Sequence, residues 1–167
     1  KYNVERKRTM GIPKELERVR LTKKEQLEEW VSKALFYTKK ENTTKILPKP
    51  GEIYTADMGV NVGSEINGVR PFFILTATTY NGNSGTVTGI PLSQKEFAIK
   101  GQVRVDNEIL DEGKVSGVLK TEMITTISKG RIGTYIDRLN DKGIHEVGKA
   151  LETFLIPLKR LKKKKSK

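Results

Sequence analysis

The hydrophobic pattern of this sequence changes across residues 41–51, and the change limits what the chain can fold into. The segment ENTTKILPKPG holds two prolines and a glycine. Proline lacks a backbone N–H and biases the residue before it toward extended geometry, so this segment ends any helix that precedes it. We therefore divide the chain into a helical extension with a linker at 1–49, a main domain at 50–156 and a tail at 157–167.

One long helix is predicted before this boundary. Thr22 and Glu25 have the spacing of a capping box at a helix start. An apolar stripe at helical spacing follows: Leu27, Trp30, Val31, Ala34 and Leu35. These features predict a helix over residues 23–40 that packs its stripe on the main domain or on a partner. Residues 1–21 lack such periodicity and are expected to be weakly ordered, apart from a short helix near 14–20.

The main domain is predicted to be a small β-barrel. Five runs have the composition of strands, at residues 52–57, 71–79, 85–91, 101–105 and 117–126. Residues 80–85 contain an Asn-Gly pair, which predicts a tight hairpin because both residues tolerate positive φ. A last helix is expected after Asn140 or Asp141. Several short strands separated by turns favour a barrel over a parallel sheet, so the predicted class is α+β, mainly β.

The net charge of +12 is carried by the two flanks. Residues 1–49 hold 14 basic and 7 acidic side chains, and residues 157–167 hold 7 basic and no acidic ones, whereas residues 50–156 hold 11 and 13. Such flanks favour a polyanionic partner, nucleic acid above all, through salt-dependent attraction to phosphates. Basic tails that only aid solubility are the alternative.

The composition also excludes several chemistries. The chain has no cysteine and a single histidine, His145, which rules out a disulfide scaffold, a thiolate zinc site, a cysteine nucleophile and a multi-histidine metal site. Its apolar runs are far shorter than the roughly 20 residues that a membrane span needs, and no signal peptide is expected. We therefore expect a cytoplasmic protein with no cofactor, no metal and no membrane attachment.

Three motifs follow one another in the main domain. G-E-I-Y-x-A-D stands at residues 51–57, G-S-E-x-x-G-x-R-P at 63–71 and I-P-L-S at 90–93. Together they resemble the MazF/PemK family of bacterial toxin endoribonucleases, which includes Kid. In that family the loop motif is G-[SH]-E-Q-x-G-x-R-P, and the later strand ends in V-P-[VC]-T. The spacing from Arg70 to Ser93 needs no gap, and the resemblance covers the main domain.

The resemblance implies a fold and an activity. The fold is a small SH3-like barrel, the plasmid toxin fold, with a C-terminal helix, to which this chain adds its N-terminal helical extension. The activity is metal-independent cleavage of single-stranded RNA (mRNA) by a homodimer. The ribose 2′-OH attacks the adjacent phosphate, which gives 2′,3′-cyclic phosphate and 5′-OH ends and inhibits translation and growth. The implied partner is an antitoxin, with DNA association only through the antitoxin complex.

Four side chains are the catalytic candidates that the resemblance implies. Arg70 falls at the family's catalytic arginine, and its charged fork suits two phosphate oxygens; a structural pair with Glu65 is the alternative. Ser93 stands in place of the family's threonine and keeps the hydroxyl, unless it is an ordinary turn serine. Lys120 and Glu122 replace an Arg/Asp acid–base pair of some members. At period two they would share one face of a strand, where a surface cross-strand pair is the alternative.

The loop motif and the predicted hairpin supply the candidate RNA contacts: Ser64, Glu65, Asn67, Tyr80, Asn81 and Asn83. Such side chains bind base edges or phosphates of unstacked RNA, and an exposed Tyr80 would stack on a base. Met123 and Thr125 replace the family's Gln and Arg, so no RNA sequence preference is carried over. His145 lies outside the motifs and is expected on the surface of the last helix.

Two other functions stay open at this point. A degenerate barrel of the same fold would bind nucleic acid without cutting it, which an analysis of RNA end products would reveal. Alternatively, the N-terminal helix fills the groove that an antitoxin would occupy, so that the protein inhibits itself or binds a different partner. Removal of residues 1–45 would raise the activity of a self-inhibited protein and leave it level otherwise.

Overall fold

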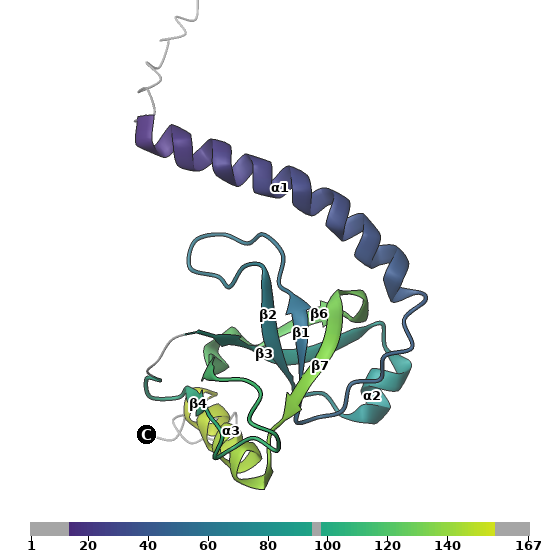
Figure 1. Cartoon of the computed structure of the whole chain (residues 1–167), viewed down its shortest axis with the longest axis vertical. Helices are drawn as coiled ribbons and strands as arrows, with labels where there is room; N and C mark the ends of the chain where they lie inside the picture. The colour runs from purple at the N-terminus through teal and green to yellow at the C-terminus, as the bar shows by residue number, and fades with distance from the viewer. Residues whose placement is uncertain (1–13, 95–97, 156–167) are drawn as a thin grey trace, which may run out of the picture.

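The computed structural model describes residues 14–94 and 98–155 (Figure 1). The strands are β1 (Glu52–Asp57), β2 (Val69–Ile74), β3 (Thr86–Ser93), β4 (Val103–Val105), β5 (Gly117–Leu119), β6 (Thr125–Ser128) and β7 (Ile132–Arg138). The helices are α1 (Lys14–Glu41), α2 (Thr78–Asn83) and α3 (Asp141–Phe154), and the 3₁₀ turns are η1 (Thr121–Met123) and η2 (Lys129–Arg131). Among these described helices, none has the length and apolar character needed to span a membrane.

The seven strands form one curled antiparallel sheet in the order β4-β5-β3-β2-β1-β7, with β6 paired to β3. β3 pairs with three other strands. Its first half pairs with β6 and its last two residues pair with β5 on one edge, and β2 pairs with its other edge. The register of Phe73 opposite Ile90 joins the two central strands. The predicted class, α+β and mainly β, is confirmed.

Two apolar clusters cover the two faces of the sheet. Successive side chains of a strand point to opposite faces, and the neighbours Phe72 and Phe73 of β2 accordingly belong to different clusters. Phe73 packs in one cluster with Leu92 of β3 and Val147 of α3. Phe72 packs in the other with Val87 of β3. Because both faces are buried at protein packing density, the sheet supports the loops at its ends firmly.

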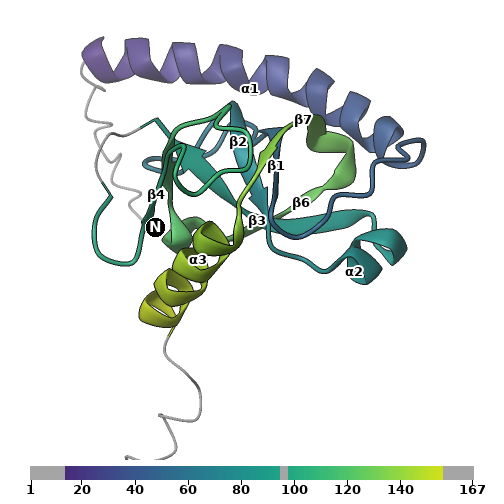
Figure 2. The same cartoon turned by 60° about the horizontal axis from the view of Figure 1, so that its bottom comes forward.

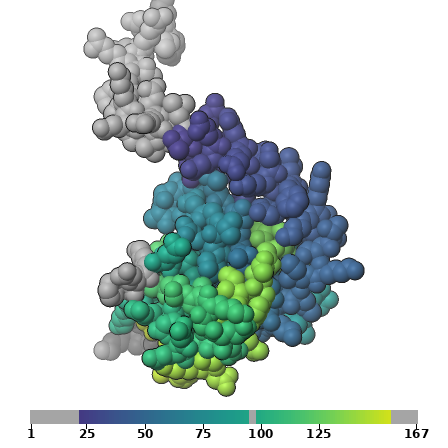
Figure 3. Space-filling model, in the orientation of Figure 1, coloured from purple at the N-terminus to yellow at the C-terminus, as the bar shows by residue number. Residues whose placement is uncertain are grey.

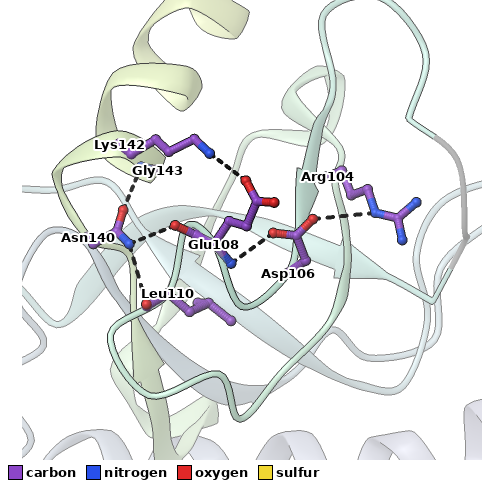
Figure 4. A network of polar contacts seen from close by, with 7 residues as sticks. All are labelled: Arg104, Asp106, Glu108, Leu110, Asn140, Lys142 and Gly143. Atoms are coloured by element: carbon purple, nitrogen blue, oxygen red, sulfur yellow. Dashed lines mark hydrogen bonds and ion pairs between the residues drawn. The ribbon is translucent and has the colours of Figure 1, made fainter.

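A polar network at the start of α3 fixes this helix to the sheet (Figure 4). Asn140 caps the helix, since its Oδ1 accepts a hydrogen bond from the Gly143 N–H at 3.0 Å. The Asn140 Nδ2 donates to the carbonyls of Glu108 and Leu110, and Lys142 pairs with the Glu108 carboxylate at 2.6 Å. Asn140 is thus confirmed as the cap, and it ties α3 to the segment between β4 and β5.

The long helix begins earlier than its predicted cap. α1 starts at Lys14, so Thr22 lies inside the helix and does not cap it. The sequence of residues 14–21, KELERVRL, is rich in strong helix formers, which allow the helix to continue through the threonine. The helix lies across one end of the sheet, above the loop that joins β1 to β2 (Figures 1 and 2). The space-filling view shows it resting against the barrel (Figure 3).

Two predictions in the main domain are wrong, and one strand was missed. Residues 78–83 form α2 instead of the turn of a hairpin. The strand predicted at 117–126 is interrupted by the 3₁₀ turn η1, which separates β5 from β6. β7 was not among the predicted strands, because its sequence IGTYIDR mixes apolar and polar residues without strict alternation. The division of the chain at residues 49 and 156 stays a prediction, and the tail at 157–167 lies outside the described residues.

Candidate active site

The loop of residues 58–68, called the β1–β2 loop below, is closed at its neck by backbone hydrogen bonds. The Met58 N–H donates to the Gly68 carbonyl, and the Gly68 N–H donates to the Gly59 carbonyl, both at 2.9 Å. Gly59 and Gly68 have φ of 81° and 71°, a region that glycine occupies without the steric cost of a Cβ. The glycines of the motif therefore allow the chain to reverse sharply between β1 and β2.

Side-chain amides order the interior of the β1–β2 loop. The Asn61 Nδ2 donates to the carbonyls of Met58 and Ile66 at 3.0 and 2.8 Å, and the Asn61 N–H donates to the Asn67 Oδ1. The Asn67 Nδ2 donates to the Glu65 carbonyl at 2.8 Å. Backbone groups that would otherwise need water are thus paired within the loop, so the loop presents a defined surface.

Arg70 follows this loop on β2 and is oriented by it. Its Nε donates to the Asn67 carbonyl at 3.1 Å, and the side chain is half-buried. Among the described residues, its terminal Nη groups make no hydrogen bond and no ion pair. The alternative pair with Glu65 does not form, because the Glu65 Oε2 accepts from the Val62 N–H at 2.9 Å instead. The two Nη groups are therefore available to an anion.

Ser93 and Arg70 lie side by side at one end of the sheet. The paired register of β2 with β3 ends with Phe72 opposite Pro91. Arg70 and Ser93 each lie two residues beyond that pair, on β2 and β3 respectively. Both side chains line a hollow of about 390 Å³, together with three residues of the β1–β2 loop and two next to Ser93: Glu65, Ile66, Asn67, Leu92 and Gln94. The motif spacing therefore corresponds to a real spatial pair.

A second hollow adjoins the first. It has a volume of about 420 Å³, and Glu65 and Ile66 border both hollows. Glu122 lines this second hollow. Its Oε1 accepts a hydrogen bond from the Nε2 of Gln102, which is not part of the lining, at 2.6 Å. Glu122 is thus held by a neighbour that the sequence interpretation missed, since Gln102 lies on a different part of the chain and outside every motif.

The predicted arrangement of Lys120 and Glu122 on one strand face is wrong. Lys120 immediately precedes η1 and Glu122 lies within it, so the period-two geometry of a strand does not apply to them. Lys120 borders neither of the two hollows, whereas Glu122 borders one. The turn forms because the chain must leave β5, which pairs with β4 and the end of β3, and enter β6, which pairs with the start of β3.

The other predicted RNA contacts are distributed between two places. Ser64 is exposed in the β1–β2 loop, close in sequence to the first hollow. Tyr80 and Asn83 belong to α2, which precedes the opposite end of β3 from Ser93. From Thr86 to Ser93 the extended strand β3 advances seven residues, which corresponds to roughly 23 Å. α2 and the Arg70–Ser93 hollow therefore lie far apart.

Asn81 has a structural role and is not an RNA contact in this structure. Its side chain has no exposed surface. The Asn81 Nδ2 donates to the carbonyls of Pro48 and Thr76 at 2.7 and 3.0 Å, and its Oδ1 accepts from the Thr76 hydroxyl at 2.6 Å. These bonds use the amide to attach the linker before β1 to α2, so the side chain is buried in this structure and does not face solvent as expected.

No described group of three or more His, Asp or Glu side chains is arranged to hold a metal ion. His145 lies on the exposed side of α3, away from the residues that line the two hollows. Among the candidate site residues, Tyr80 has an altered pKa. Hydrogen bonds from the Thr86 and Ser84 hydroxyls lower the pKa of Tyr80. The ionisable and hydroxyl side chains that line the two hollows are Arg70, Ser93, Glu65, Glu122, Thr125 and Arg131.

Comparison with known proteins identifies the class. Residues 49–155 match the family described as PemK-like, MazF-like toxin of type II toxin-antitoxin system. The chain is 31% identical over 112 residues to Endoribonuclease EndoA of Bacillus subtilis, an alignment that covers 66% of this chain and 96% of that protein. It is also 31% identical over 107 residues to Endoribonuclease MazF of Staphylococcus saprophyticus, covering 63% and 88%. The chain belongs to the PemK/MazF-like toxin family, as its motifs predicted.

Solved structures of similar fold support the architecture. MazF from Deinococcus radiodurans superposes with a TM-score of 0.58 at 20% identity, covering 66% of this chain and 97% of that one. An endoribonuclease in complex with its cognate antitoxin from a mycobacterial species gives a TM-score of 0.55 at 22% identity, with the same coverage. The SH3-like barrel of the plasmid toxin fold is thereby confirmed for the main domain.

Proposed function

We propose that this protein is a metal-independent endoribonuclease toxin that cleaves single-stranded RNA, with mRNA as its cellular substrate. The observation that carries the proposal is the hollow bordered by both Arg70 and Ser93, which unites an anion-binding fork with a hydroxyl at the positions expected from the family motifs. The names of the two relatives, both called endoribonuclease, support the activity.

The proposed reaction places its developing charge next to Arg70. The ribose 2′-oxygen forms a bond to the adjacent phosphorus, the bond from phosphorus to the 5′-oxygen breaks, and the products carry a 2′,3′-cyclic phosphate and a 5′-OH. Negative charge accumulates on the nonbridging oxygens in between, where fixed donors stabilise it most. The Arg70 Nη groups hold two of these oxygens, and the Ser93 hydroxyl donates to one.

The 2′-OH must lose a proton, and the leaving 5′-oxygen must gain one. Glu122 is the proposed proton acceptor, because it borders the adjoining hollow and its carboxylate is fixed by Gln102. The proton for the leaving 5′-oxygen is proposed to come from solvent water. Lys120, at the start of the same 3₁₀ turn, is proposed to add positive charge for the phosphate of a neighbouring nucleotide. Ser64, Glu65 and Asn67 of the β1–β2 loop are the proposed contacts for the nucleotides that flank the cleaved bond.

The same surface suits the proposed protein partner. We assign the protein a homodimeric state and a cognate antitoxin whose acidic segment would compete with RNA for Arg70 and Lys120, because complementary charge selects a partner of opposite sign. One of the structures with this fold is named as an endoribonuclease in complex with its cognate antitoxin. DNA would be reached only through such a complex, and an mRNA substrate places the activity in the cytoplasm.

The test is cleavage of a long mixed-sequence RNA in EDTA, with the new ends mapped. Wild-type protein should cut at a short recurring sequence and leave 5′-OH ends, and Arg70→Ala should not cut. Arg104→Ala is the matched control, since it removes an exposed arginine of β4. Intact RNA after incubation with folded wild-type protein, and again with protein that lacks residues 1–45, would reject the nuclease and leave a barrel that only binds nucleic acid.

A further inference from the structure

One face of α1 contacts the β1–β2 segment at three regularly spaced points. Lys23, Trp30 and Tyr37 are seven residues apart, which is close to two helical turns, so their side chains lie on one face of the helix. They contact Asn61, Gly59 and Asp57 respectively. The helix therefore runs antiparallel to the chain that leaves β1 and enters the loop (Figure 2).

The central contact is a ring packed on bare backbone. A Cβ placed on Gly59 would stand 2.7 Å from the Trp30 Cζ2, so only glycine permits this approach. The Arg131 guanidinium lies 5.3 Å from the centroid of the Trp30 ring, and its Nε donates to the Asp57 carbonyl at 2.6 Å. Burial in this contact lowers the pKa of Arg131, against the opposing effect of the Asp57 carboxylate.

The Tyr37 contact connects the helix to the neck of the loop through one carboxylate. The Tyr37 hydroxyl donates to the Asp57 Oδ2 at 2.9 Å, and the Asp57 Oδ1 accepts from the Gly59 N–H at 2.9 Å. Asp57 is only 7% exposed, so each of these bonds replaces water at a buried charge. Burial, followed by the bond to Asp57, raises the pKa of Tyr37, which keeps the hydroxyl a donor.

The Lys23 contact leads to the candidate active site. The Lys23 Nζ donates to the Asn61 carbonyl, the Asn61 N–H donates to the Asn67 side chain, and the Asn67 carbonyl accepts from the Arg70 Nε. This is a continuous set of hydrogen bonds from α1 to the arginine. Each member has a defined partner, so Lys23 and the Arg70 guanidinium are linked through the loop.

The other end of α1 is attached to the barrel independently of the loop. The Lys40 Nζ donates to the Ile132 carbonyl at 2.8 Å, and Ser128 donates to Glu41. Gly130 approaches the helix backbone so closely that a Cβ there would overlap the Tyr37 carbonyl. The helix is thus fixed to β6, η2 and the start of β7, and it extends from there over the loop.

We propose that α1 holds the β1–β2 loop in the conformation that presents Arg70 to RNA, with Lys23, Trp30 and Tyr37 as positioning residues. No described residue of α1 borders the hollow that Arg70 shares with Ser93. The helix supports the site instead of filling it, which is opposite to the self-inhibition considered from the sequence. The consequence for cleavage rests on the proposed function, whereas the effect on the loop does not.

The first measurement is amide hydrogen exchange in the full-length protein, without RNA. Trp30→Ala and Lys23→Met should each raise the exchange rates of the Gly59, Asn61 and Gly68 amides by about tenfold. Each substitution removes one contact or hydrogen bond that the loop must break to open, so the free energy of local opening falls. The control variants are Leu35→Ala, which removes a 63% exposed side chain of the same helix, and Lys24→Met, which removes an exposed neighbour. Both should leave these rates unchanged.

Amides outside the loop separate a local effect from general unfolding. The Leu75 N–H, bonded to the Thr88 carbonyl, and the Asn140 N–H, bonded to the Ile109 carbonyl, report on the sheet and on α3, and they should exchange as in the wild type. Lys23→Met keeps the Trp30 packing, so it tests the proposal even where Trp30→Ala unfolds. Unchanged loop exchange in folded Trp30→Ala and in Lys23→Met would overturn the proposal.

The second measurement is steady-state cleavage of a short RNA by the same four variants. Misplacing Arg70 should lower kcat by about tenfold with a smaller change in KM, because its contacts strengthen toward the transition state. Leu35→Ala and Lys24→Met should match the wild type. A rise in kcat for Trp30→Ala or Lys23→Met would show that α1 inhibits and would overturn the proposal. If the wild-type protein does not cut RNA but Trp30→Ala and Lys23→Met still show faster loop exchange, the role of α1 is supported and the proposed function is rejected.

Discussion

Two segments of this chain look alike in sequence and differ in structure. Residues 63–71 and 80–85 both combine glycine with asparagine, and both are predicted to contact RNA. The first is an irregular loop as far as Gly68, then enters β2, and it borders an open hollow that includes Arg70. The second contributes the end of α2 and contains Asn81, which has no exposed surface. Glycine and asparagine indicate where the backbone can turn, and they do not indicate which side of the turn faces solvent.

The two asparagines use the same chemistry for different purposes. The Asn67 Nδ2 donates to the carbonyl of Glu65 within its own loop, whereas the Asn81 Nδ2 donates to the carbonyl of Pro48, 33 residues away. Pro48 is buried, and a buried carbonyl requires a donor. The Asn81 side chain is therefore buried against the linker, to which it donates its hydrogen bond. Asn67 is half-buried, and its backbone carbonyl accepts the hydrogen bond from the Arg70 Nε.

The largest expected effect concerns the open segment. Arg70→Lys keeps the positive charge but loses the planar fork and the Nε bond to Asn67, so kcat should fall by about 100-fold, the loss seen when one preorganised donor is removed from an anionic transition state. Single-turnover cleavage of a short RNA measures this. Wild-type rates in Arg70→Lys would mean that charge alone suffices and that the fork has no role.

The next effect concerns the buried segment. Asn81→Ala should lower the free energy of unfolding by about 1–3 kcal/mol, because the Pro48 and Thr76 carbonyls lose their donor. Urea denaturation followed by circular dichroism measures it, and Asn83→Ala in the exposed part of α2 is the control. At a temperature where both variants are folded, cleavage should be unaffected. A loss of cleavage with unchanged stability would instead make Asn81 an RNA contact.

A smaller effect is expected at Ser93. Ser93→Ala removes a hydroxyl from the hollow and should lower kcat about tenfold, the usual scale for one hydrogen bond to a charged group. Ser93→Thr restores the family's residue and should hold or raise the rate, since the methyl limits rotation of the hydroxyl. Ser116→Ala, between β4 and β5, is the control. A large loss in Ser93→Thr would place the hydroxyl in a different role.

The parts of the site that the sequence predicted are those fixed by local register. The interval between Arg70 and Ser93 corresponds to two paired strands and their connection, and the pairing of β2 with β3 brings both residues to one hollow. Lys120 and Glu122 were misplaced because η1 forms where the chain passes from β5 to β6. The packing of Trp30 on the main domain was expected, but its partner Gly59, 29 residues away, was not. The expected stripe packs only in part, since Leu27, Val31 and Leu35 stay exposed.

The smallest effect tests whether α2 takes any part in RNA binding. Tyr80→Phe removes the hydroxyl that contacts Thr86 at 3.3 Å while leaving the 47% exposed ring for stacking, so kcat/KM should change by less than about twofold, as for most surface substitutions. Tyr80→Ala removes the ring as well and should give the same result, because α2 precedes the end of β3 that is remote from Ser93. Competition binding with a short RNA, at two salt concentrations, measures both variants. Weaker binding by Tyr80→Ala alone would show that a bound strand extends along β3 to α2, and the two segments would then share one RNA surface despite their different local structures.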